Sequence, residues 1–342
     1  MNYIEHINTA LQPSHPIGLR AVDLFAGCGG ISLGFEAMGI AVDGYEMDPK
    51  AASTYNQNLQ GHCFTERLTL TTSISNGYDI VLGGPPCQPF SVGGHQKGVE
   101  DDRNGFPVFI NAIRNIQPKL WLFENVRGML YSNRDYFEQI VTELGELGYR
   151  IEYRILNAVN YGVPQNRERL FVVGHRSSFN YPPPLTKRTT VGEAIGDLID
   201  TTIDESKILT ASMDRYVLNY EKASKCVNPR DLHLNKPART LTCRNIAAPT
   251  GDMQRVRLSD GRRRRISIRE AARLQSFPDW FTFHGTETQQ YYQIGNAVPP
   301  ILALHLAKSV VQCLTSNEYS NNVLLESPPL SIGAQTMIVF EQ

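Results

Sequence analysis

Cys87 is the residue with the clearest capacity for chemistry, and it lies in the stretch GGPPCQPFS at residues 83–91. A short, mostly apolar run at residues 78–82 precedes it and has the length of a buried strand. Two glycines and two prolines then force a sharp, stiff turn that cannot relax into a helix. A thiol at the carboxyl end of a sheet strand is well placed to act as a nucleophile. A buried structural cysteine explains this turn alone equally well.

Glu124 is the next candidate, because it follows an uninterrupted apolar run at residues 120–123. A helical pattern at 106–116 separates this run from the one before Cys87. Two strands joined by one helix are parallel and usually neighbours, so Cys87 and Glu124 should lie at the same edge of the sheet. Open α/β proteins bind ligands at that edge. A solvated glutamate at a strand end remains an equally good interpretation.

Two further polar segments could contribute to the same site. The segment NYGVPQNRER at 160–169 carries Arg167 and Arg169, and Arg169 directly precedes an apolar run, so its side chain can point inward. A surface cluster of ion pairs is the alternative for this basic pair. The glycine-rich loop at 92–105 follows Cys87 directly, and it is either a plain surface loop or a lid that closes on substrate.

A nucleotide-binding unit is predicted near the start of the chain. An expected strand at 20–25 ends in the glycine-rich turn 26–30, and a helical pattern follows. A second strand ends at Glu46, 19 residues past Gly27, which is near the spacing at which an acid reaches ribose hydroxyls. Ser32 stands where a dinucleotide fingerprint has its third glycine. The pattern therefore favours an adenosine cofactor without a pyrophosphate, and a tight turn without any ligand stays open.

Composition indicates an ordinary globular protein. The chain has 342 residues, of which 41% are hydrophobic and 20% charged, enough for one large domain and a smaller one. No apolar run approaches the ~18 residues of a membrane span, and the first 16 residues lack the order of a secretory signal. Six cysteines are widely spread without a C-x-x-C pair, so disulfides and zinc are not expected and a reducing cytoplasm fits best.

Elements outside these motifs are less regular. Residues 1–19 are expected to be a polar lead-in at the surface, and the character of the chain changes near the proline run at 182–184. Residues 185–260 have weak periodicity, and their fold cannot be predicted from pattern alone. Residues 269–274 begin a helix, 293–300 form a turn, and a helix of about 301–313 follows. The tail at 316–342 is expected to be loosely held.

Charge is distributed unevenly along the chain. The net charge is -1, yet residues 225–273 hold thirteen Lys or Arg against four Asp or Glu, a balance of +9. A phosphate backbone responds to local charge, so this segment could contact nucleic acid. The densest part is DGRRRR at 260–265, expected to be a turn whose four arginines suit phosphate contacts. A merely solvated charged face is the alternative.

Taken together, the motifs resemble those of the DNA (cytosine-5-)-methyltransferases of the bacterial restriction–modification type. Six stretches carry the resemblance: DLFAGCGG (23–30), GGPPCQPFS (83–91), ENVRG (124–128), QNRER (165–169), REAARLQSFPDW (269–280) and GNAVPP (295–300). The resemblance implies a Rossmann-like α/β methyltransferase fold, with a mostly parallel, doubly wound sheet and a smaller target-recognition domain. It places the catalytic and cofactor-binding domain at 1–180 plus 290–315, and the target-recognition domain at 181–289.

The resemblance also implies the reaction, which is transfer of a methyl group from S-adenosylmethionine to carbon 5 of a cytosine. Cys87 would be the nucleophile that adds to carbon 6, and its thiolate is the active form, so a lowered pKa is expected. Glu124 would hold ring nitrogen 3 and the exocyclic amine. Arg169, with Arg167 supporting it, would bind the carbonyl oxygen of the base. The cytosine must be flipped out of the duplex, which would explain a mobile loop at 92–105.

For the methyl donor, the resemblance implies a pocket of nine residues and no metal. Phe25 and Met47 would pack on the adenine, Glu46 would take the ribose hydroxyls, and Glu66 would hold the adenine amine. Met47 stands where an aromatic residue often lies, and Glu66 replaces the usual aspartate. The remaining members of the expected pocket are Gly27, Gly29, Pro86, Asn296 and Val298.

The partners implied are double-stranded DNA and a cognate restriction endonuclease that acts on the same site without a stable complex. The enzyme is expected to be a monomer in the bacterial cytoplasm, associated with the nucleoid, and not with a membrane. The arginines expected to contact DNA are Arg239, Arg244, Arg255, Arg257, Arg262, Arg263, Arg264 and Arg265.

Three alternative functions differ in substrate or class. An RNA-directed member of the same family would methylate a tRNA cytosine, although the long basic segment favours a reader of duplex sequence. A catalytically inactive nucleic-acid-binding protein is disfavoured by the intact Cys87, Glu124 and Arg169. A nicotinamide oxidoreductase is disfavoured by Ser32.

Overall fold

A seven-stranded sheet forms the centre of the molecule, with the strand order β3-β2-β1-β4-β5-β8-β6. The computed structural model describes residues 1–86, 104–201, 204–223, 225, 230–247 and 252–316. The strands from β3 to β5 run parallel, and β8 is antiparallel to both of its neighbours. The predicted fold class, a mostly parallel sheet, is confirmed. The strands are β1 (Arg20–Leu24), β2 (Ala41–Glu46), β3 (Cys63–Thr65), β4 (Ile80–Gly83), β5 (Leu120–Val126), β6 (Arg150–Asn157) and β8 (Glu168–His175).

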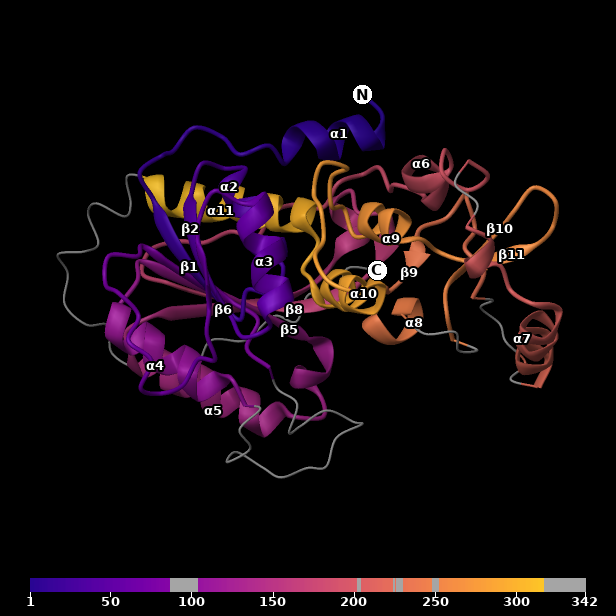
Figure 1. The fold of residues 1–342 in the computed structure, drawn as a ribbon. Helices are drawn as coiled ribbons and strands as arrows, with labels where there is room; N and C mark the ends of the chain where they lie inside the picture. The colour runs from indigo at the N-terminus through magenta and orange to yellow at the C-terminus, as the bar shows by residue number, and fades with distance from the viewer. Residues whose placement is uncertain (87–103, 202–203, 224, 226–229, 248–251, 317–342) are drawn as a thin grey trace.

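Helices cover both faces of this sheet (Figure 1). Successive side chains of a strand point to opposite faces, and both faces here are apolar. In β5, Leu120 and Leu122 join one buried cluster, whereas Trp121 and Phe123 join the other. This continuous apolar pattern is why the segment forms a central strand rather than an edge. The covering helices are α2 (Gly30–Glu36), α3 (Pro49–Asn58) and α11 (Pro300–Thr315) on one face, and α4 (Phe106–Ile116) and α5 (Arg134–Glu146) on the other.

The strands that lead to Cys87 and Glu124 are parallel neighbours, as predicted. β4 pairs with β5, with Gly83 opposite Phe123. β5 is longer than the apolar run suggested, because it continues to Val126, so Glu124 lies within the strand and not after it. Cys87 itself lies outside the described residues, whereas the turn that leads to it is described as far as Pro86.

The first residues correct an expectation, because they are not a polar lead-in. Helix α1 (Tyr3–Ala10) buries Ile7 completely, together with Leu11 just after it. The hydroxyl of Tyr3 donates to the carbonyl of Arg273 at 2.7 Å. Tyr3, Ile7 and Leu11 are the buried large apolar residues here, spaced four apart, and that signal is too sparse to stand out among polar neighbours.

The smaller part of the molecule lies beside one end of the sheet (Figure 1). It contains an antiparallel pair, β10 and β11, and β9 pairs in parallel with the short strand β7 of the sheet region. The main buried apolar cluster continues from the sheet into this part, and it includes Ile195, Val256 and Ala271 as well as Leu304. The remaining elements of the whole molecule are β7 (Gln165–Asn166), α6 (Val191–Ile195), α7 (Ala211–Ala223), β9 (Ala238–Arg239), α8 (Cys243–Ala247), β10 (Arg255–Arg257), β11 (Arg263–Arg265), α9 (Ile268–Leu274) and α10 (Glu287–Asn296), with 3-10 helices η2 (Arg127–Leu130), η3 (Ala158–Tyr161) and η4 (Glu205–Lys207).

The stretch expected as a turn at 293–300 is mostly helical. Helix α10 continues to Asn296, and only residues 297–299 separate it from α11. The combined stretch Glu287–Thr315 is apolar and long enough to cross a membrane by those two criteria alone. It consists of two helices with a break between them, and α11 packs against α2. These residues therefore belong to the core.

Candidate active site

The backbone after β1 takes a conformation that few side chains allow. Phe25 has φ 64°, and Gly27 and Gly29 have φ 57° and 88°. Positive φ is uncommon outside glycine and is typical of functional turns. A Cβ atom on Gly29 would also lie 2.9 Å from Tyr55 Cδ2, and one on Gly30 would collide with the carbonyl oxygen of Val298. The glycines therefore permit close packing between this turn, α3 and the chain before α11.

Glu46, at the end of β2, is held beside this turn by backbone groups. Its Oε2 accepts from the amide of Gly27 at 2.9 Å, and its Oε1 accepts from the amide of Asp48 at 2.7 Å. Both carboxylate oxygens keep further lone pairs that can accept from a ligand. The carboxylate is thus fixed in position, yet it retains the capacity to bind hydroxyl groups.

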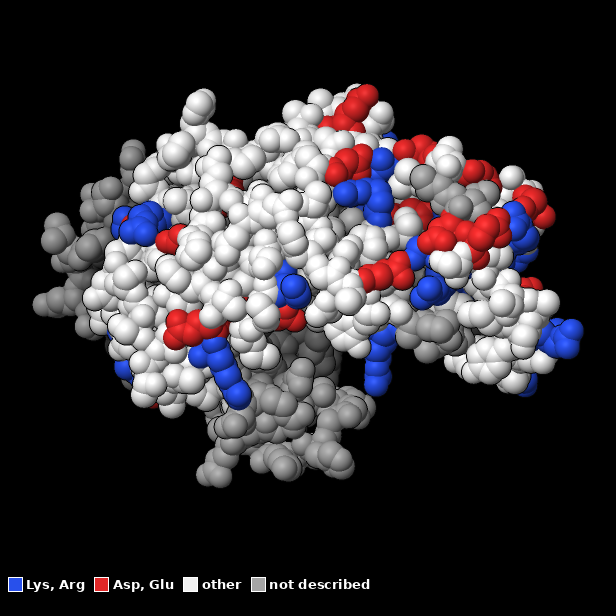
Figure 2. All heavy atoms as spheres, in the orientation of Figure 1, with Lys and Arg blue, Asp and Glu red and all other residues white. Residues whose placement is uncertain are grey.

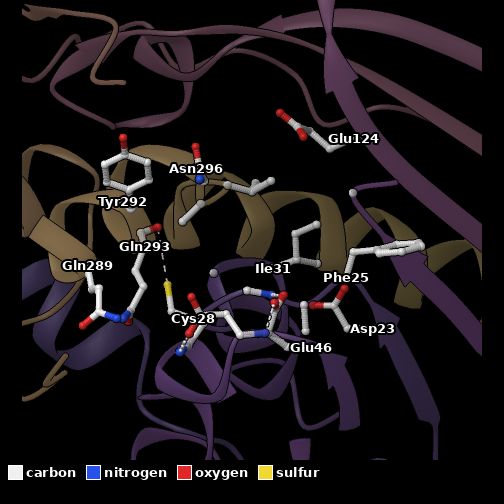
Figure 3. A pocket seen from close by; sticks show the side chains of 18 of the residues that line it. Asp23, Phe25, Cys28, Ile31, Glu46, Glu124, Gln289, Tyr292, Gln293 and Asn296 are labelled. Carbon is white, nitrogen blue, oxygen red and sulfur yellow. Dashed lines mark hydrogen bonds between the residues drawn. The ribbon is translucent and has the colours of Figure 1, made fainter. Parts of the chain in front are cut away.

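A cavity of about 450 Å³, called the first cavity below, opens between the turn, β5 and α10 (Figure 3). Glu124 lines the same cavity as the residues expected around the methyl donor, although the two sets come from different motifs. The predicted site residues on its wall are Phe25, Gly27, Glu46, Glu124, Asn296 and Val298.

Four predicted donor residues are not among those that line the first cavity. Gly29 shapes the turn, as described above. Met47 is 67% exposed. The backbone amide of Glu66 donates to the carbonyl of Glu46 at 3.0 Å. Pro86 packs near Phe25, because a Cβ atom on Gly105 would meet both rings. The roles of these four residues remain predictions.

Asp23 lines the first cavity and was not anticipated. Its side chain is 1% exposed, and Ser32 Oγ donates to Oδ2 at 2.7 Å. Oδ1 has no hydrogen-bond partner among the described residues. Burial raises the pKa of this carboxyl from 3.8 to about 7. A carboxylate inside an otherwise apolar strand was a signal in the sequence that could have identified it.

One face of α10 also lines the first cavity and was missed. Thr288, Gln289, Tyr292 and Gln293 precede Asn296 with helical spacing. Figure 3 shows Gln289, Tyr292 and Gln293 on the side opposite Phe25. Because residues 293–300 were expected to form a turn, the helical periodicity of these residues was not recognised in the sequence. Cys28 lies nearby, and its thiol donates to the carbonyl of Gln293 at 3.7 Å. Burial raises the pKa of that thiol, so it is not poised as a nucleophile.

Glu124 forms an ion pair with Arg169, with 3.0 Å between Oε1 and Nε. Both side chains are largely buried. A Cβ atom on Gly84 would lie 3.9 Å from Glu124 Oε2, so the carboxylate lies against the turn that leads to Cys87. Asn125 Nδ2 donates to the carbonyl of Pro85 at 3.0 Å and ties β5 to the same turn. The structure therefore brings Glu124, Arg169 and the base of the Cys87 turn together.

A second cavity, also of about 450 Å³, lies on the other side of this ion pair. It is polar, and its lining includes Arg127, Asn157, Asn166, Arg169 and Thr240. Because Glu124 lines the first cavity and Arg169 the second, their ion pair stands between the two. A ligand that reached from one cavity to the other would meet both charged groups.

Arg167 does not have the position expected of a base-binding residue. Its side chain is buried, and Nη1 donates to the carbonyl of Leu241 at 2.8 Å. Burial, and then the charge of Arg169, lower the pKa of Arg167 to about 9. It lines neither cavity described above. Arg167 therefore holds the segment around Leu241, and its expected support of Arg169 at the base stays a prediction.

Three arginines expected to contact DNA are buried in ion pairs, which corrects that prediction. Arg264 binds Glu270 through both Nη atoms at 2.7 Å, and neither side chain is exposed. Arg255 contacts Asp231 and Glu221, each at 2.8 Å. Arg263 contacts Asp214 at 2.6 Å. The run 262–265 is not a turn, because 263–265 form β11, where alternate side chains point inward.

The other arginines in the set remain accessible, and their contacts with DNA stay predictions. Arg257 pairs with Asp231, and Arg262 pairs with Asp260. Arg239 is partly exposed and lies 3.7 Å from Asp252. Arg244 is exposed, and Arg265 is half-buried; neither forms an ion pair with a described acid. In Figure 2, acidic and basic side chains alternate over this part of the molecule, so the face shown is not uniformly positive.

Comparisons with known proteins point to one family. A family profile described as C-5 cytosine-specific DNA methylase matches residues 19–312. The Type II methyltransferase M.AplI of Arthrospira platensis is 54% identical over 318 residues, 92% of each chain. M1.HphI of Haemophilus parahaemolyticus is 33% identical over 330 residues, 88% of each chain.

The fold is shared with solved structures at lower sequence identity. The Entamoeba histolytica methyltransferase EhMeth has a TM-score of 0.69 at 18% identity, covering 87% of this chain and 99% of that one. Among the parts of the chain that the structure describes, no group of three or more His, Cys, Asp or Glu could hold a metal.

Because the family profile covers most of the sequence and the relatives match over most of their length, the chain belongs to the C-5 cytosine-specific DNA methylase family: it is a DNA (cytosine-5-)-methyltransferase of the bacterial restriction–modification type, which takes its methyl group from S-adenosylmethionine.

Proposed function

We propose that Cys87, Glu124 and Arg169 carry out this methyl transfer where the two cavities meet, on a cytosine turned out of a DNA duplex. The observation that supports this most is that Glu124 lines the first cavity together with Phe25, Glu46 and Asn296. An acidic group at one end of a cavity whose other end suits an adenosine would hold acceptor and donor close together.

The first cavity is proposed to hold S-adenosylmethionine. When bound, this group supplies an electrophilic methyl group. Glu46 accepts from the ribose hydroxyls, and Phe25 packs on the adenine. Residues 296–298 close the opposite wall. The volume of the first cavity and the fixed carboxylate of Glu46 fit such a ligand. The further donor contacts proposed from the resemblance are Gly27, Gly29, Met47, Glu66, Pro86 and Val298.

On the acceptor side, the Cys87 thiolate adds to carbon 6 of the cytosine. A carbon–sulfur bond forms, and the displaced electron pair makes carbon 5 nucleophilic. Glu124 holds ring nitrogen 3 and the exocyclic amine and shares a proton with them, while Arg169 stabilises the negative charge on the carbonyl oxygen. Carbon 5 would take the methyl group as its bond to the sulfonium sulfur breaks, which releases S-adenosylhomocysteine. A base would then remove the proton from carbon 5, and the thiolate would leave as the 5,6 double bond forms again. The ion pair between Glu124 and Arg169 supports these roles, because it holds the two side chains next to each other.

We further propose that residues 181–289 form the target-recognition domain and that duplex DNA lies against its accessible arginines. A basic side chain that can reach a phosphate contributes to affinity in a salt-dependent way. The candidates that remain after the buried arginines are removed are Arg239, Arg244, Arg257, Arg262 and Arg265. Flipping the cytosine out of the duplex gives the site access to both faces of the ring.

DNA is the substrate of the enzyme, and its biological setting is proposed from its relatives. Because the similar proteins are named Type II methyltransferases, methylation would protect host DNA from a cognate endonuclease that reads the same site without a stable complex. We expect the enzyme to act in the bacterial cytoplasm as a monomer, associated with the nucleoid.

The proposal is tested by incubating the purified protein with plasmid DNA and labelled S-adenosylmethionine, followed by bisulfite sequencing. We expect label in 5-methylcytosine at one recurring site. Cys87→Ser should abolish turnover and leave donor binding largely intact, because the role proposed for Cys87 is attack on the base and not contact with the donor. Label that entered tRNA instead of DNA would contradict the choice of substrate, and loss of donor binding by Cys87→Ser would contradict the role of that residue.

A further inference from the structure

Two buried glutamines lie between the first cavity and the smaller part of the molecule. Gln165, in β7, and Gln275, just after α9, are both fully buried. Gln165 Nε2 donates to Gln275 Oε1 at 2.5 Å, and Gln275 Nε2 donates to the carbonyl of Ala297 at 2.6 Å. Ala297 lines the first cavity between Asn296 and Val298. One end of this hydrogen-bonded chain is therefore the wall proposed to hold the methyl donor.

The other end of the chain is Leu241, where the polypeptide crosses the smaller part. Gln165 Oε1 accepts from the amide of Leu241 at 2.8 Å, and Arg167 donates to its carbonyl at 2.8 Å. Both backbone polar groups of one residue are thus held by buried side chains of β7 and its neighbour. The preceding residue, Thr240, donates from Oγ1 to the carbonyl of Asn166 at 2.6 Å and lines the second cavity.

A buried chain of this kind resists independent movement of its two ends. An unsatisfied buried polar group is unfavourable, so the amides favour positions in which every hydrogen bond is made. The low local dielectric strengthens both the bonds and the penalty for losing them. A shift of Ala297 would strain the hydrogen bonds of Gln165, and a shift of Leu241 would strain those of Gln275. The walls of the two cavities should therefore prefer matched positions.

We propose that Gln275 is a positioning residue that couples occupancy of the first cavity to binding of target DNA at the second. The inference rests on the proposed function in one respect, namely that the methyl donor binds beside Ala297. A ligand that fixes Ala297 also fixes Leu241 and Thr240 through the two amides. Linkage requires the effect to be reciprocal, so DNA should strengthen donor binding by the same factor.

The coupling is measured as a ratio of two dissociation constants. A duplex that contains the site mapped by bisulfite sequencing is titrated with the enzyme, without and with saturating S-adenosylhomocysteine, which occupies the donor site without turnover. For the unaltered enzyme we expect S-adenosylhomocysteine to tighten DNA binding at least about fivefold, within the range typical of coupled sites. A ratio near one in the unaltered enzyme would overturn the proposal.

Gln275→Met removes the amide and nearly preserves the volume. Gln165 Nε2 still has the carbonyl of Leu274 as an acceptor at 3.2 Å, so the loss is concentrated at Ala297. We expect the coupling ratio to fall to within about twofold of one, while binding of S-adenosylhomocysteine without DNA changes less than about threefold. An unchanged ratio in this variant would overturn the proposal. If Gln275→Met does not fold, Gln275→Asn is measured instead, because its shorter side chain keeps an amide but cannot span both partners.

Gln254→Met is the matched control. Gln254 is also buried, and its Nε2 donates to the carbonyls of Arg239 and Thr240, next to Leu241. It makes no hydrogen bond to Ala297 among the described residues. We expect this variant to keep its coupling ratio even if DNA binding itself weakens. Loss of coupling in the control as well would show that any disturbance near Thr240 is sufficient, and it would overturn a specific role for Gln275.

A variant of Glu46 tests the assignment of the donor site separately from the role of Gln275. Glu46→Gln weakens the acceptor for the ribose hydroxyls, so S-adenosylhomocysteine binding without DNA should fall at least about tenfold, equivalent to about 1.4 kcal/mol. If Glu46→Gln binds normally, the assignment of the first cavity is wrong. If Glu46→Gln loses binding and Gln275→Met keeps full coupling, the cavity is correct and the coupling role is wrong.

Discussion

The first cavity and the arginine network of β10 and β11 handle charge in different ways. In the cavity, Glu46 is held by the backbone amides of Gly27 and Asp48 and has no basic side chain paired with it among the described residues. In the network, the charges of Arg263 and Arg264 are neutralised by acidic side chains and withdrawn from solvent. Charged residues therefore line a cavity in one region and hold elements together in the other.

This difference explains why the sum of charges along a segment does not predict which of its arginines DNA can reach. The balance of +9 over residues 225–273 excludes Asp214 and Glu221, which lie outside that range and pair with Arg263 and Arg255. These acids belong to α7, so the buried arginines fasten this helix to the β10–β11 pair. A segment with a large positive balance can thus hold several of its arginines inside the protein, and accessibility decides what DNA can reach.

The largest effect expected in the cavity is on chemistry and not on folding. Glu124→Gln keeps the shape of the side chain but removes the charge paired with Arg169 and the group that shares a proton with the base. General acid–base groups typically contribute 10²–10⁴-fold, so kcat should fall by a factor of that order. The measurement is single-turnover methyl transfer, with the thermal midpoint as the control for folding. A fall of less than about tenfold would mean that Glu124 does not share a proton in the reaction.

In the arginine network the largest effect should be on stability. Arg264→Met leaves Glu270 buried without its partner, and breaking such a pair costs about 3–5 kcal/mol of unfolding free energy. Urea denaturation would measure this loss. Arg262→Met is the matched control from the same run, and because Arg262 is exposed, its midpoint should not change. Equal midpoints for both variants would mean that the buried pair does not hold the hairpin in place.

A double substitution sharpens the same comparison. Replacing both Arg264 and Glu270 by methionine removes the two buried charges together, so much of the lost stability should return. The unfolding free energy of the double variant should exceed that of Arg264→Met. If the loss of unfolding free energy in the double variant equals the sum of the losses in Arg264→Met and Glu270→Met, the two side chains do not act as a pair.

Asp23 should make the stability of the ligand-free enzyme depend on pH. Its pKa rises from 3.8 in the unfolded chain to about 7 in the folded protein, so between these values the folded state binds more protons. Stability from this group is therefore present below about pH 4 and is lost as pH rises through 7. Asp23→Asn, which can still accept from Ser32, should be more stable than the unaltered enzyme at pH 8 by at most about 4 kcal/mol.

The advantage of Asp23→Asn should disappear near pH 4, where the aspartic acid is also neutral. Urea midpoints of the two proteins at pH 4 and pH 8 provide the measurement. A difference that is the same at both pH values would mean that the raised pKa is not the cause. The pH dependence distinguishes an unpaired carboxyl in the cavity from the paired charges of the network.

The smallest effect should come from an accessible arginine. Arg244→Ala should leave stability unchanged and weaken DNA binding by a similar factor on all sequences. The slope of log affinity against log salt concentration should decrease by about 1 if Arg244 contacts one phosphate. An unchanged slope would assign Arg244 to the solvated surface. A slope decrease for Arg262→Met as well would extend the DNA contact to the turn that precedes β11.

Much of the fold could be predicted because its signals are local. The apolar runs of β4 and β5 are uninterrupted, and a recognisable motif begins directly after each run. Helices α1 and α10 were not predicted, for different reasons. Helix α1 has few apolar residues, whereas the glycine and prolines at 295–300 suggested a turn and drew attention away from the helical spacing before them. Short-range spacing is therefore reliable only where nothing interrupts it.

The site could be predicted in part, because its residues lie in contiguous motifs. Phe25, Glu46 and Asn296 all line the first cavity, as the spacing and the resemblance suggested. The contact of Arg167 with Leu241 spans 74 residues, and that of Gln165 with Gln275 spans 110. No periodicity links positions so far apart, so these roles required a three-dimensional structure.

The central claim is that the Cys87 turn and Glu124 form one reaction centre beside the methyl donor. It is tested most directly with a duplex in which 5-fluorocytosine replaces the target base, because fluorine at carbon 5 cannot leave as a proton does and the thioether persists. We predict a complex that survives denaturation, forms only with S-adenosylmethionine, and maps by peptide mass spectrometry to Cys87. Absence of such a complex while ordinary DNA is methylated, or a crosslink at another residue, would contradict the account.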